Sequence, residues 1–453
     1  MTTEAKRENG ASASRQVNRR NFLKTTGVAA GVLGGIEGIL AARRAPAFAQ
    51  GTKLHWVRWV DFIPESDVEL KRQMPEASKA LGAECVLETI NANDLQARIT
   101  AAIQSGAGAD IFNFQYNWAH LYQNAVSDVS DVASDLGKSE GGFYEIFPPS
   151  CQVNGKWLAL PHSIVGNAVA YRKSWLKEAG ASEFPKTWDA AAKLFPALKK
   201  KGKPYGQTLG HTFGDAPTFT YTMLWAYGGA ETDKTGKKVV INTKGAVDSV
   251  KFMQSFWKDS CDEGGLAWDD TNNNRAFHAG EISATLNGAS IYIVAKRQKE
   301  KIKDDKGEPM YLDIGHAPLP SGPSGAYLLF LNQSNALMKY GKNQKLAKDF
   351  LRWIHKTENY GKWFDSQEGY SVGSTKVWEK NPMWTRLDEP LKMFRTAANN
   401  TRLFGYAGPS TAHATEAFTK YVVTDMYAKG VQGMKAEDAV KWAEGELKKI
   451  YEA

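Results

Sequence analysis

Residues 84–114, ECVLETINANDLQARITAAIQSGAGADIFNF, combine two strand patterns and one helix pattern in a short stretch. The apolar run from Glu84 to Ile90 predicts a strand. From Asp94 to Gln104, apolar side chains recur at helical spacing, and two glycines then end the helix. The apolar segment from Asp110 to Phe114 predicts a second, buried strand, so the stretch indicates a strand-helix-strand unit.

The segment before this stretch repeats the same order. Residues from Lys53 to Val60 are rich in Trp and Val and predict a strand, and the segment from Asp67 to Leu81 predicts a helix. Alternation of strands and helices is typical of a parallel sheet covered by helices. We therefore expect an α/β fold.

The rest of the chain continues with mixed elements. Expected strands are 156–161, 167–172 and 239–241, and expected helices follow Thr187 and cover about 245–259, 344–355 and the C-terminal segment. Removal of the first 49 of the 453 residues leaves 404. Because a single hydrophobic core rarely serves more than about 250–300 residues, two lobes are expected.

Residues 1–49 have the layout of an export signal. The basic segment Asn18-Arg19-Arg20-Asn21-Phe22-Leu23-Lys24 precedes a mildly apolar run, and Ala47-Phe48-Ala49 suits cleavage before Gln50. The arginine pair resembles a twin-arginine motif, which predicts export of the folded protein by the twin-arginine translocase. The run is too short and too rich in glycine for a permanent anchor, so we expect a soluble periplasmic protein.

Charge and motifs exclude several classes of function. The first 49 residues hold eight Lys and Arg against three Asp and Glu, so they account for five of the eight net positive charges. The remaining lysines are spread as solvated faces, which argues against a nucleic-acid partner. No sequence signature of a hydrolase, a metalloprotease, a nucleotide site or a calcium loop occurs, so we expect neither an enzyme nor a cofactor.

Cys85, Cys151 and Cys261 have no metal-ligand spacing. At most one disulfide can form among three thiols. Cys85 lies in a strand-like apolar run and is expected to be buried, whereas pairing of Cys151 with Cys261 stays open.

Several short segments, in order along the chain, resemble the family 1 extracellular solute-binding proteins of bacterial ABC importers, the group of maltose-binding protein. These segments are 93–99, 106–111, 154–156, 160–161, 171–173, 185–188, 277–281, 318–320 and 347–351. The most specific among them is Pro185-Lys186-Thr187-Trp188. Each segment alone is weak evidence, but their shared order covers nearly all of the chain after residue 49.

The resemblance implies a type II periplasmic-binding-protein fold, in which two α/β lobes are joined by a hinge and close over a ligand. It places lobe 1 at residues 50–163 plus 318–370 and lobe 2 at 164–317 plus 371–453. It also implies that the chain crosses between the lobes near 162–166, 315–319 and 369–373. The expected partners are a small solute and an ABC permease in the inner membrane, and the protein is expected to be a monomer.

Two loops after predicted strands are rich in aromatic and polar side chains. Ligands of open α/β sheets bind beyond the carboxyl ends of the strands, where these loops lie. Sugars need flat aromatic faces for their C–H surfaces and amides or carboxylates for their hydroxyls. The candidate ligand residues from this argument are Trp59, Asp61, Gln115, Tyr116, Asn117 and Trp118. Trp59 and Trp118 also suit a role as core residues.

The resemblance implies a second set of ligand residues, in lobe 2 and the hinge. They are His162, Phe219, Ser290, Tyr292 and Tyr370. His162 also suits the role of a hydrogen-bonded hinge residue. Ala216 stands near a position where the maltose-binding relatives have a carboxylate, so maltodextrin itself is a poor candidate.

A sugar or oligosaccharide is therefore the favoured ligand. A polyamine would need several carboxylates between the aromatic rings, and these loops offer chiefly Asp61. A sugar phosphate would need a cation there, and Arg58 points to the opposite face of its strand from Trp59. Polyamines, sugar phosphates and other small organic solutes remain the alternatives within binding proteins, and a secreted carbohydrate-active enzyme is the alternative of another class.

Overall fold

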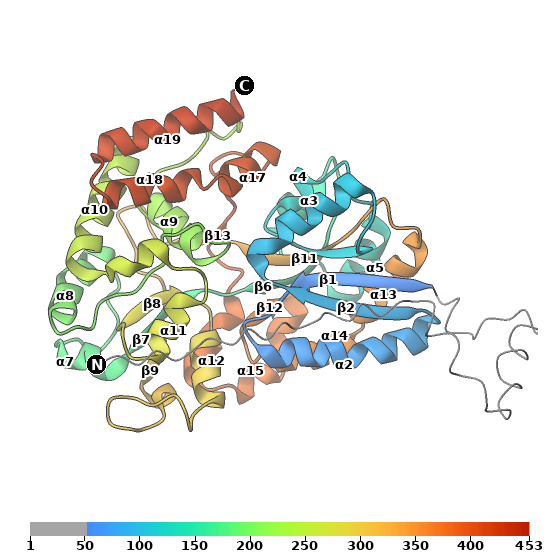
Figure 1. The fold of residues 1–453 in the computed structure, drawn as a ribbon, viewed down its shortest axis with the longest axis horizontal. Helices are drawn as coiled ribbons and strands as arrows, with labels where there is room; N and C mark the ends of the chain where they lie inside the picture. Colours follow the sequence, from blue (N-terminus) through green and yellow to red (C-terminus); the bar gives the residue numbers. More distant parts are fainter. Residues whose placement is uncertain (1–51, 453) are drawn as a thin grey trace, which may run out of the picture. The chain divides into compact units, whose positions relative to one another are not determined.

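A computed structural model describes residues 52–452 of the chain (Figure 1). The expected signal peptide and its arginine pair lie outside the described residues. Within them, the chain is built on two separate β-sheets with helices packed around each. The α/β class expected from the sequence is confirmed.

The larger sheet has six strands in the order β12-β6-β11-β3-β1-β2. Their bounds are β1 Lys53–Trp59, β2 Glu84–Ile90, β3 Ile111–Gln115, β6 Leu160–Val165, β11 Leu331–Leu337 and β12 Ser371–Gly373. Strands β1, β2 and β3 run parallel, as the strand-helix-strand pattern predicts. Strand β11 runs antiparallel to both of its neighbours, so the sheet is mixed.

Helices cover this sheet because their apolar faces match its buried side chains. Their bounds are α2 Pro64–Leu81, α3 Leu95–Ser105, α5 Ser130–Glu140, α13 Gln344–Ile354 and α14 Thr357–Ser366. Helix α13 buries Phe350 and Trp353 from its apolar stripe. Gly82 ends α2 in the left-handed conformation, with φ of 65°, which favours glycine at this position. These helices and the larger sheet form the lobe that contains β1 and the loop after it.

The smaller sheet has three antiparallel strands in the order β8-β7-β9. These are β7 Ala168–Arg172, β8 Ala284–Asn287 and β9 Ile314–Ala317, and the longer helices around them are α8 Trp188–Lys200, α9 Asp215–Ala226, α10 Lys244–Ser260, α18 Val422–Val431 and α19 Ala436–Tyr451. The Thr187 hydroxyl accepts a hydrogen bond from the Ala190 N–H, which confirms Thr187 as the cap of α8. Helix α9 is buried over most of its length and begins at the smaller sheet's side of the cleft described below.

Shorter elements complete the fold. They are α4 Trp118–Leu121, α6 Phe147–Cys151, α7 Lys173–Glu178, α11 Asn272–His278, α12 Ser290–Arg297, α15 Met383–Arg386, α16 Glu389–Lys392, α17 Ala412–Thr419, β4 Gln152–Val153, β5 Lys156–Trp157, β10 Leu328–Leu329 and β13 Thr401–Arg402, with short 3₁₀ turns between them. The strand expected over 239–241 does not form, because Val239 makes only an isolated bridge to Thr232.

The chain passes between the two sheets more than once. It leaves β6 and enters β7 through Gly166 and Asn167 alone, and it returns between β9 and β11. Residues 371–373, which were expected in lobe 2, form β12 and pair with β6 of the larger sheet. The chain therefore leaves the larger sheet for the last time after residue 373. The division into lobes otherwise stays a prediction.

The three cysteines are free and buried in the described part of the chain. The expected burial of Cys85 is confirmed. No helix among residues 52–452 is long and apolar enough to cross a membrane.

Candidate functional site

Two adjoining cavities lie between elements of the larger sheet and elements of the smaller one. The first, of about 20 Å³, is lined by Trp59, Phe62, Val165, Asn167, Phe213, Gly214, Asp215, Asp270, Asn287, Gly288, Leu331 and Tyr370. The second, of about 130 Å³, is lined by Val60, Asp61, Phe62, Asn91, Ala92, Asn93, Asp269, Asp270 and Thr271. Because both contain Phe62 and Asp270, we treat them as one region and call it the cleft. Ligand pockets usually measure about 300–1,000 Å³, so both cavities of the cleft are smaller than a typical ligand pocket.

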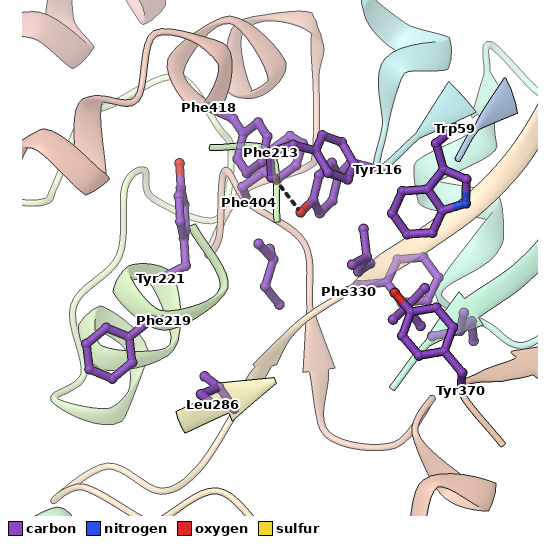
Figure 2. Packing of buried hydrophobic residues seen from close by; sticks show 14 of the residues in the cluster. Trp59, Tyr116, Phe213, Phe219, Tyr221, Leu286, Phe330, Tyr370, Phe404 and Phe418 are labelled. Carbon is purple, nitrogen blue, oxygen red and sulfur yellow. Dashed lines mark hydrogen bonds between the residues drawn. The ribbon is translucent and has the colours of Figure 1, made fainter. Parts of the chain in front are cut away.

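Aromatic rings form one wall of the cleft. Trp59, the last residue of β1, packs edge-to-face on Phe62 at 5.8 Å and on Phe213 at 6.0 Å between ring centroids. Phe62 in turn lies 6.2 Å from Tyr370. Figure 2 shows Trp59, Phe213 and Tyr370 together although they come from distant parts of the chain. The wall therefore combines rings that precede α2, α9 and β12.

Two carboxyl groups add polar side chains to the lining of the cleft. Asp270 is buried and accepts hydrogen bonds from the N–H groups of Gly214 and Asp215, at 2.9 and 2.7 Å. Asp215, the first residue of α9, accepts a hydrogen bond of 2.6 Å from Asn273 Nδ2. Burial, and then the neighbouring Asp270 carboxylate, raise the pKa of Asp215 well above its usual value. Burial also raises the pKa of Asp270.

A different arrangement holds the carboxylates at the end of β1. Arg58 is fully buried, and its guanidinium lies 3.3 Å from Asp67 Oδ1 and 3.4 Å from Asp61 Oδ2. It also donates a 3.0 Å hydrogen bond to Gln333 on β11. Burial raises the pKa of Asp67 while the Arg58 charge opposes this shift. We call Arg58, Asp61 and Asp67 the arginine cluster.

The structure brings three of the candidate ligand residues to the cleft. Trp59 and Tyr370 line the first cavity, and Asp61 lines the second. Asp61 also accepts hydrogen bonds from the Ile63 N–H and the Ser66 hydroxyl, so much of its hydrogen-bonding capacity is already used.

The candidates that follow β3 line neither cavity. The Tyr116 ring packs against Phe404 and Phe418, and its hydroxyl donates a 3.1 Å hydrogen bond to the Phe213 carbonyl (Figure 2). Trp118 is buried as the first residue of α4 and contacts Phe114 and Phe213.

Two neighbours of these residues have partners within the protein. Gln115 donates to Asn113, and Asn117 bonds Ser410 and Thr415. In this closed arrangement the segment 115–118 joins the lobes, and a direct role in ligand contact stays a prediction.

The candidates suggested by the resemblance are also placed mainly outside the cleft, apart from Tyr370. His162 is buried against His355, at 3.3 Å between ring nitrogens, and burial lowers the pKa of His355 to about 3. Phe219 packs on Trp188 among the helices around the smaller sheet, and Figure 2 shows Phe219 apart from Trp59 and Tyr370.

Ser290 lies close to the cleft but does not line it. Its hydroxyl is 3.4 Å from the Asn274 side chain, and it is buried at the start of α12. Tyr292, two residues further on, donates a 2.8 Å hydrogen bond to Asp388. Contact of either residue with a ligand stays a prediction.

The sequence argument did not single out Asn167, Phe213, Asp215, Asp270 and Asn287. Asn167 directly follows β6 and Asn287 ends β8, so the position after a strand was a usable signal for both. Asp215 and Asp270 lie 55 residues apart and meet only through the two backbone hydrogen bonds to Asp270. Nothing in the local pattern relates them. Across residues 52–452, no cluster of His, Cys, Asp and Glu has the arrangement of a metal site.

Two α/β lobes, several crossings between them and a closed, aromatic-walled cleft define a bilobal solute-binding fold. Residues 76–390 match the family of bacterial extracellular solute-binding proteins. The chain therefore belongs to that family, and the resemblance found in the sequence is confirmed.

Relatives with assigned names agree with this membership. A probable amino-acid ABC transporter periplasmic-binding protein, y4oP of Sinorhizobium fredii, is 22% identical over 69% of this chain and 71% of its own length. The maltodextrin-binding protein MdxE of Bacillus subtilis is 28% identical over a segment that covers 48% of this chain and 50% of MdxE.

Solved structures share the fold at low sequence identity. The maltose-bound MalE3 of T. maritima superposes with a TM-score of 0.73 at 19% identity, covering 88% of this chain and 99% of MalE3. A sugar transporter from Arthrobacter chlorophenolicus with bound laminaribiose gives a TM-score of 0.73 at 16% identity and the same coverage. The type II periplasmic-binding-protein architecture is thereby confirmed.

Proposed function

We propose that the protein is the substrate-receiving component of an ABC importer, and that it encloses a sugar or short oligosaccharide in the cleft and delivers it to a membrane permease. The observation that carries the choice of a sugar is the wall of Trp59, Phe62, Phe213 and Tyr370 facing amide and carboxylate side chains. Aromatic faces suit the C–H surfaces of a sugar ring, and amides and carboxylates suit its hydroxyls. The names of MdxE and of the sugar-bound structural neighbours support the same class.

Asn167 offers the sharpest test of this proposal. It lines the cleft, and its side chain makes no hydrogen bond to any described residue, so its removal should not disturb the fold. Asn167→Ala should weaken sugar binding about 5-fold, since a hydrogen bond to a ligand contributes about 1 kcal/mol. Isothermal titration with a sugar panel measures this effect, and Asn124→Ala, an exposed asparagine outside the cleft, is the matched control. Failure of every sugar in the panel to bind would contradict the proposal.

We propose that the protein is exported by the twin-arginine translocase and works in the periplasm. We also propose that it is a monomer without catalytic activity. Replacement of Arg19-Arg20 by two lysines should abolish export, because the translocase recognises the arginine pair. Cell fractionation measures this outcome. Size-exclusion chromatography of the processed protein tests the monomer, and product analysis after incubation with the bound sugar tests the absence of turnover.

A further inference from the structure

Asp215 and Asp270 bring two carboxyl groups to the same cavity without a cation. The two oxygens of Asp270 accept the N–H groups of Gly214 and Asp215, which fixes the Asp270 side chain against the first turn of α9. The Asp215 carboxyl lines the same cavity and uses only Oδ2, toward Asn273. Its other oxygen accepts no hydrogen bond from the described part of the chain.

Among residues 52–452, no Lys or Arg forms an ion pair with Asp215 or Asp270. The N-terminus of α9 supplies about half of a positive charge, which offsets only part of two negative ones. Enclosed carboxylates are normally paired with a cation, as Asp61 and Asp67 are with Arg58. Asp215 and Asp270 therefore lack the cation that Asp61 and Asp67 have in Arg58.

The aromatic rings and the Trp59 indole are two further features that indicate the chemistry of the ligand. The faces of aromatic rings attract cations, and Trp59, Phe213 and Tyr370 line the cavity together with the two carboxyl groups. Trp59 also has a buried indole N–H without a hydrogen-bond partner in the described chain. An N–H donor needs an oxygen acceptor, which a bare amine does not offer. The cavity thus combines carboxyl groups for a positive nitrogen with aromatic rings for the C–H surface of a sugar.

We propose that the ligand is an amino sugar, held with its ammonium group at Asp215 and Asp270 and its ring against the aromatic wall. This inference rests on the proposed function, because it keeps the sugar and adds the charge. An ammonium group donates three hydrogen bonds, and the free Oδ1 of Asp215 is an acceptor within the cavity. From the sequence, Asp61 was the main carboxylate expected near the aromatic rings, which disfavoured a cationic ligand. The fold brings two more carboxyl groups, Asp215 and Asp270, to the same rings.

Matched sugars on the full, processed chain test the proposal. Glucosamine, N-acetylglucosamine and glucose differ at a single ring position, and their β-linked disaccharides extend the comparison to a longer ligand. Isothermal titration at neutral pH should show the free amine bound at least about 10-fold more tightly than the acetylated and the neutral forms. High salt should weaken binding of the amine more than that of glucose.

Asp215→Asn keeps the shape of the side chain and its acceptor for Asn273, so it removes chiefly the charge. This variant should lose the preference for the amine while its affinity for glucose changes by less than about three-fold. Asp189→Asn is the control, because Asp189 is an exposed carboxyl group in the first turn of α8 and lines neither cavity of the cleft. Asp270 is unsuitable for this test since it holds the start of α9.

The outcomes separate this inference from the proposed function. Equal or tighter binding of the neutral sugars, with a ratio unchanged in Asp215→Asn, overturns the amino sugar and leaves sugar binding intact. Binding of spermidine or L-lysine with no binding of any sugar overturns both. A preference for the amine that survives in Asp189→Asn and disappears in Asp215→Asn supports the proposal.

Discussion

The two pairs of carboxyl groups beside the cleft solve the same electrostatic problem in opposite ways. Beside the larger sheet, Asp61 and Asp67 share the buried guanidinium of Arg58, which also bonds β11. Beside the smaller sheet, Asp215 and Asp270 have only backbone and amide donors. Removing one partner of a buried ion pair leaves an uncompensated charge, whereas carboxyl groups without a cation can accept one from a ligand. The same residue type thus belongs to a structural ion pair in one place and to the proposed binding site in the other.

The largest expected effect breaks the arginine cluster. Arg58→Met leaves Asp61 and Asp67 enclosed without their cation, and the free energy of unfolding should fall by about 3–5 kcal/mol. Urea denaturation measures the change. Arg72→Met is the control: Arg72 is an exposed arginine on α2 that pairs with Glu69 and Glu76, and its loss should cost less than about 1 kcal/mol. Equal effects in the two variants would contradict the role given to Arg58.

A buried carboxyl group away from the cleft extends the comparison. Burial raises the pKa of Glu231 to about 7, from an ordinary value of 4.5. Between these values the folded protein holds a proton that the unfolded chain has released, so stability falls as the pH rises from about 4.5 to about 7. The contribution is about 3 kcal/mol over this range. Glu231→Gln should reduce the fall in unfolding free energy between pH 4.5 and 7. A fall equal to that of the unchanged protein would contradict the raised pKa of Glu231.

Neutralising one member of each pair should change stability in opposite directions. Although burial raises the pKa of Asp67, Asp67→Asn removes one of the two carboxylates that balance the buried Arg58. It also loses the charged hydrogen bonds that Asp67 accepts from Arg58 and from the Asp61 N–H, and should cost about 2 kcal/mol. Asp215→Asn removes an acid whose pKa is raised in the folded state, so at pH 8 the ligand-free variant should be more stable than the unchanged protein. The gain should vanish near pH 4, where the unfolded chain is protonated as well. Thermal unfolding at both pH values measures the two variants, and the same sign for both would remove the distinction.

The smallest effect concerns ion pairs that join the lobes at the surface. Arg297, at the end of α12, pairs with Glu65 at the start of α2 and lies 2.9 Å from Glu368. Because all three side chains are partly exposed, Arg297→Gln should change the unfolding free energy by less than about 1 kcal/mol. It should instead raise the share of open molecules without ligand, which small-angle scattering measures as a larger radius of gyration. Lys303→Gln, in an exposed pair with Glu300, is the control and should leave the radius unchanged.

Local pattern was sufficient for most of the secondary structure near the cleft. The strand and helix periods of 53–114 predicted β1, β2, β3 and their helices within a few residues. The segment at 239–241 shows the limit, because a short apolar run forms a strand only when a neighbouring strand is available to pair with it. The aromatic residues around 116–118 show a second limit, since exposure after a strand depends on the packing of Phe404 and Phe418, which lie far along the chain.

The sequence by itself determined the α/β class, the two-lobed family and the position of Trp59 and Asp61 after β1, because periodicity and short ordered motifs are local properties. Only the tertiary structure decided that Asp215 and Asp270 meet without a cation, while Asp61 and Asp67 meet around Arg58. The reason is physical: the environment of a carboxyl group depends on which distant backbone and side-chain groups surround it, and spacing along the chain does not record that.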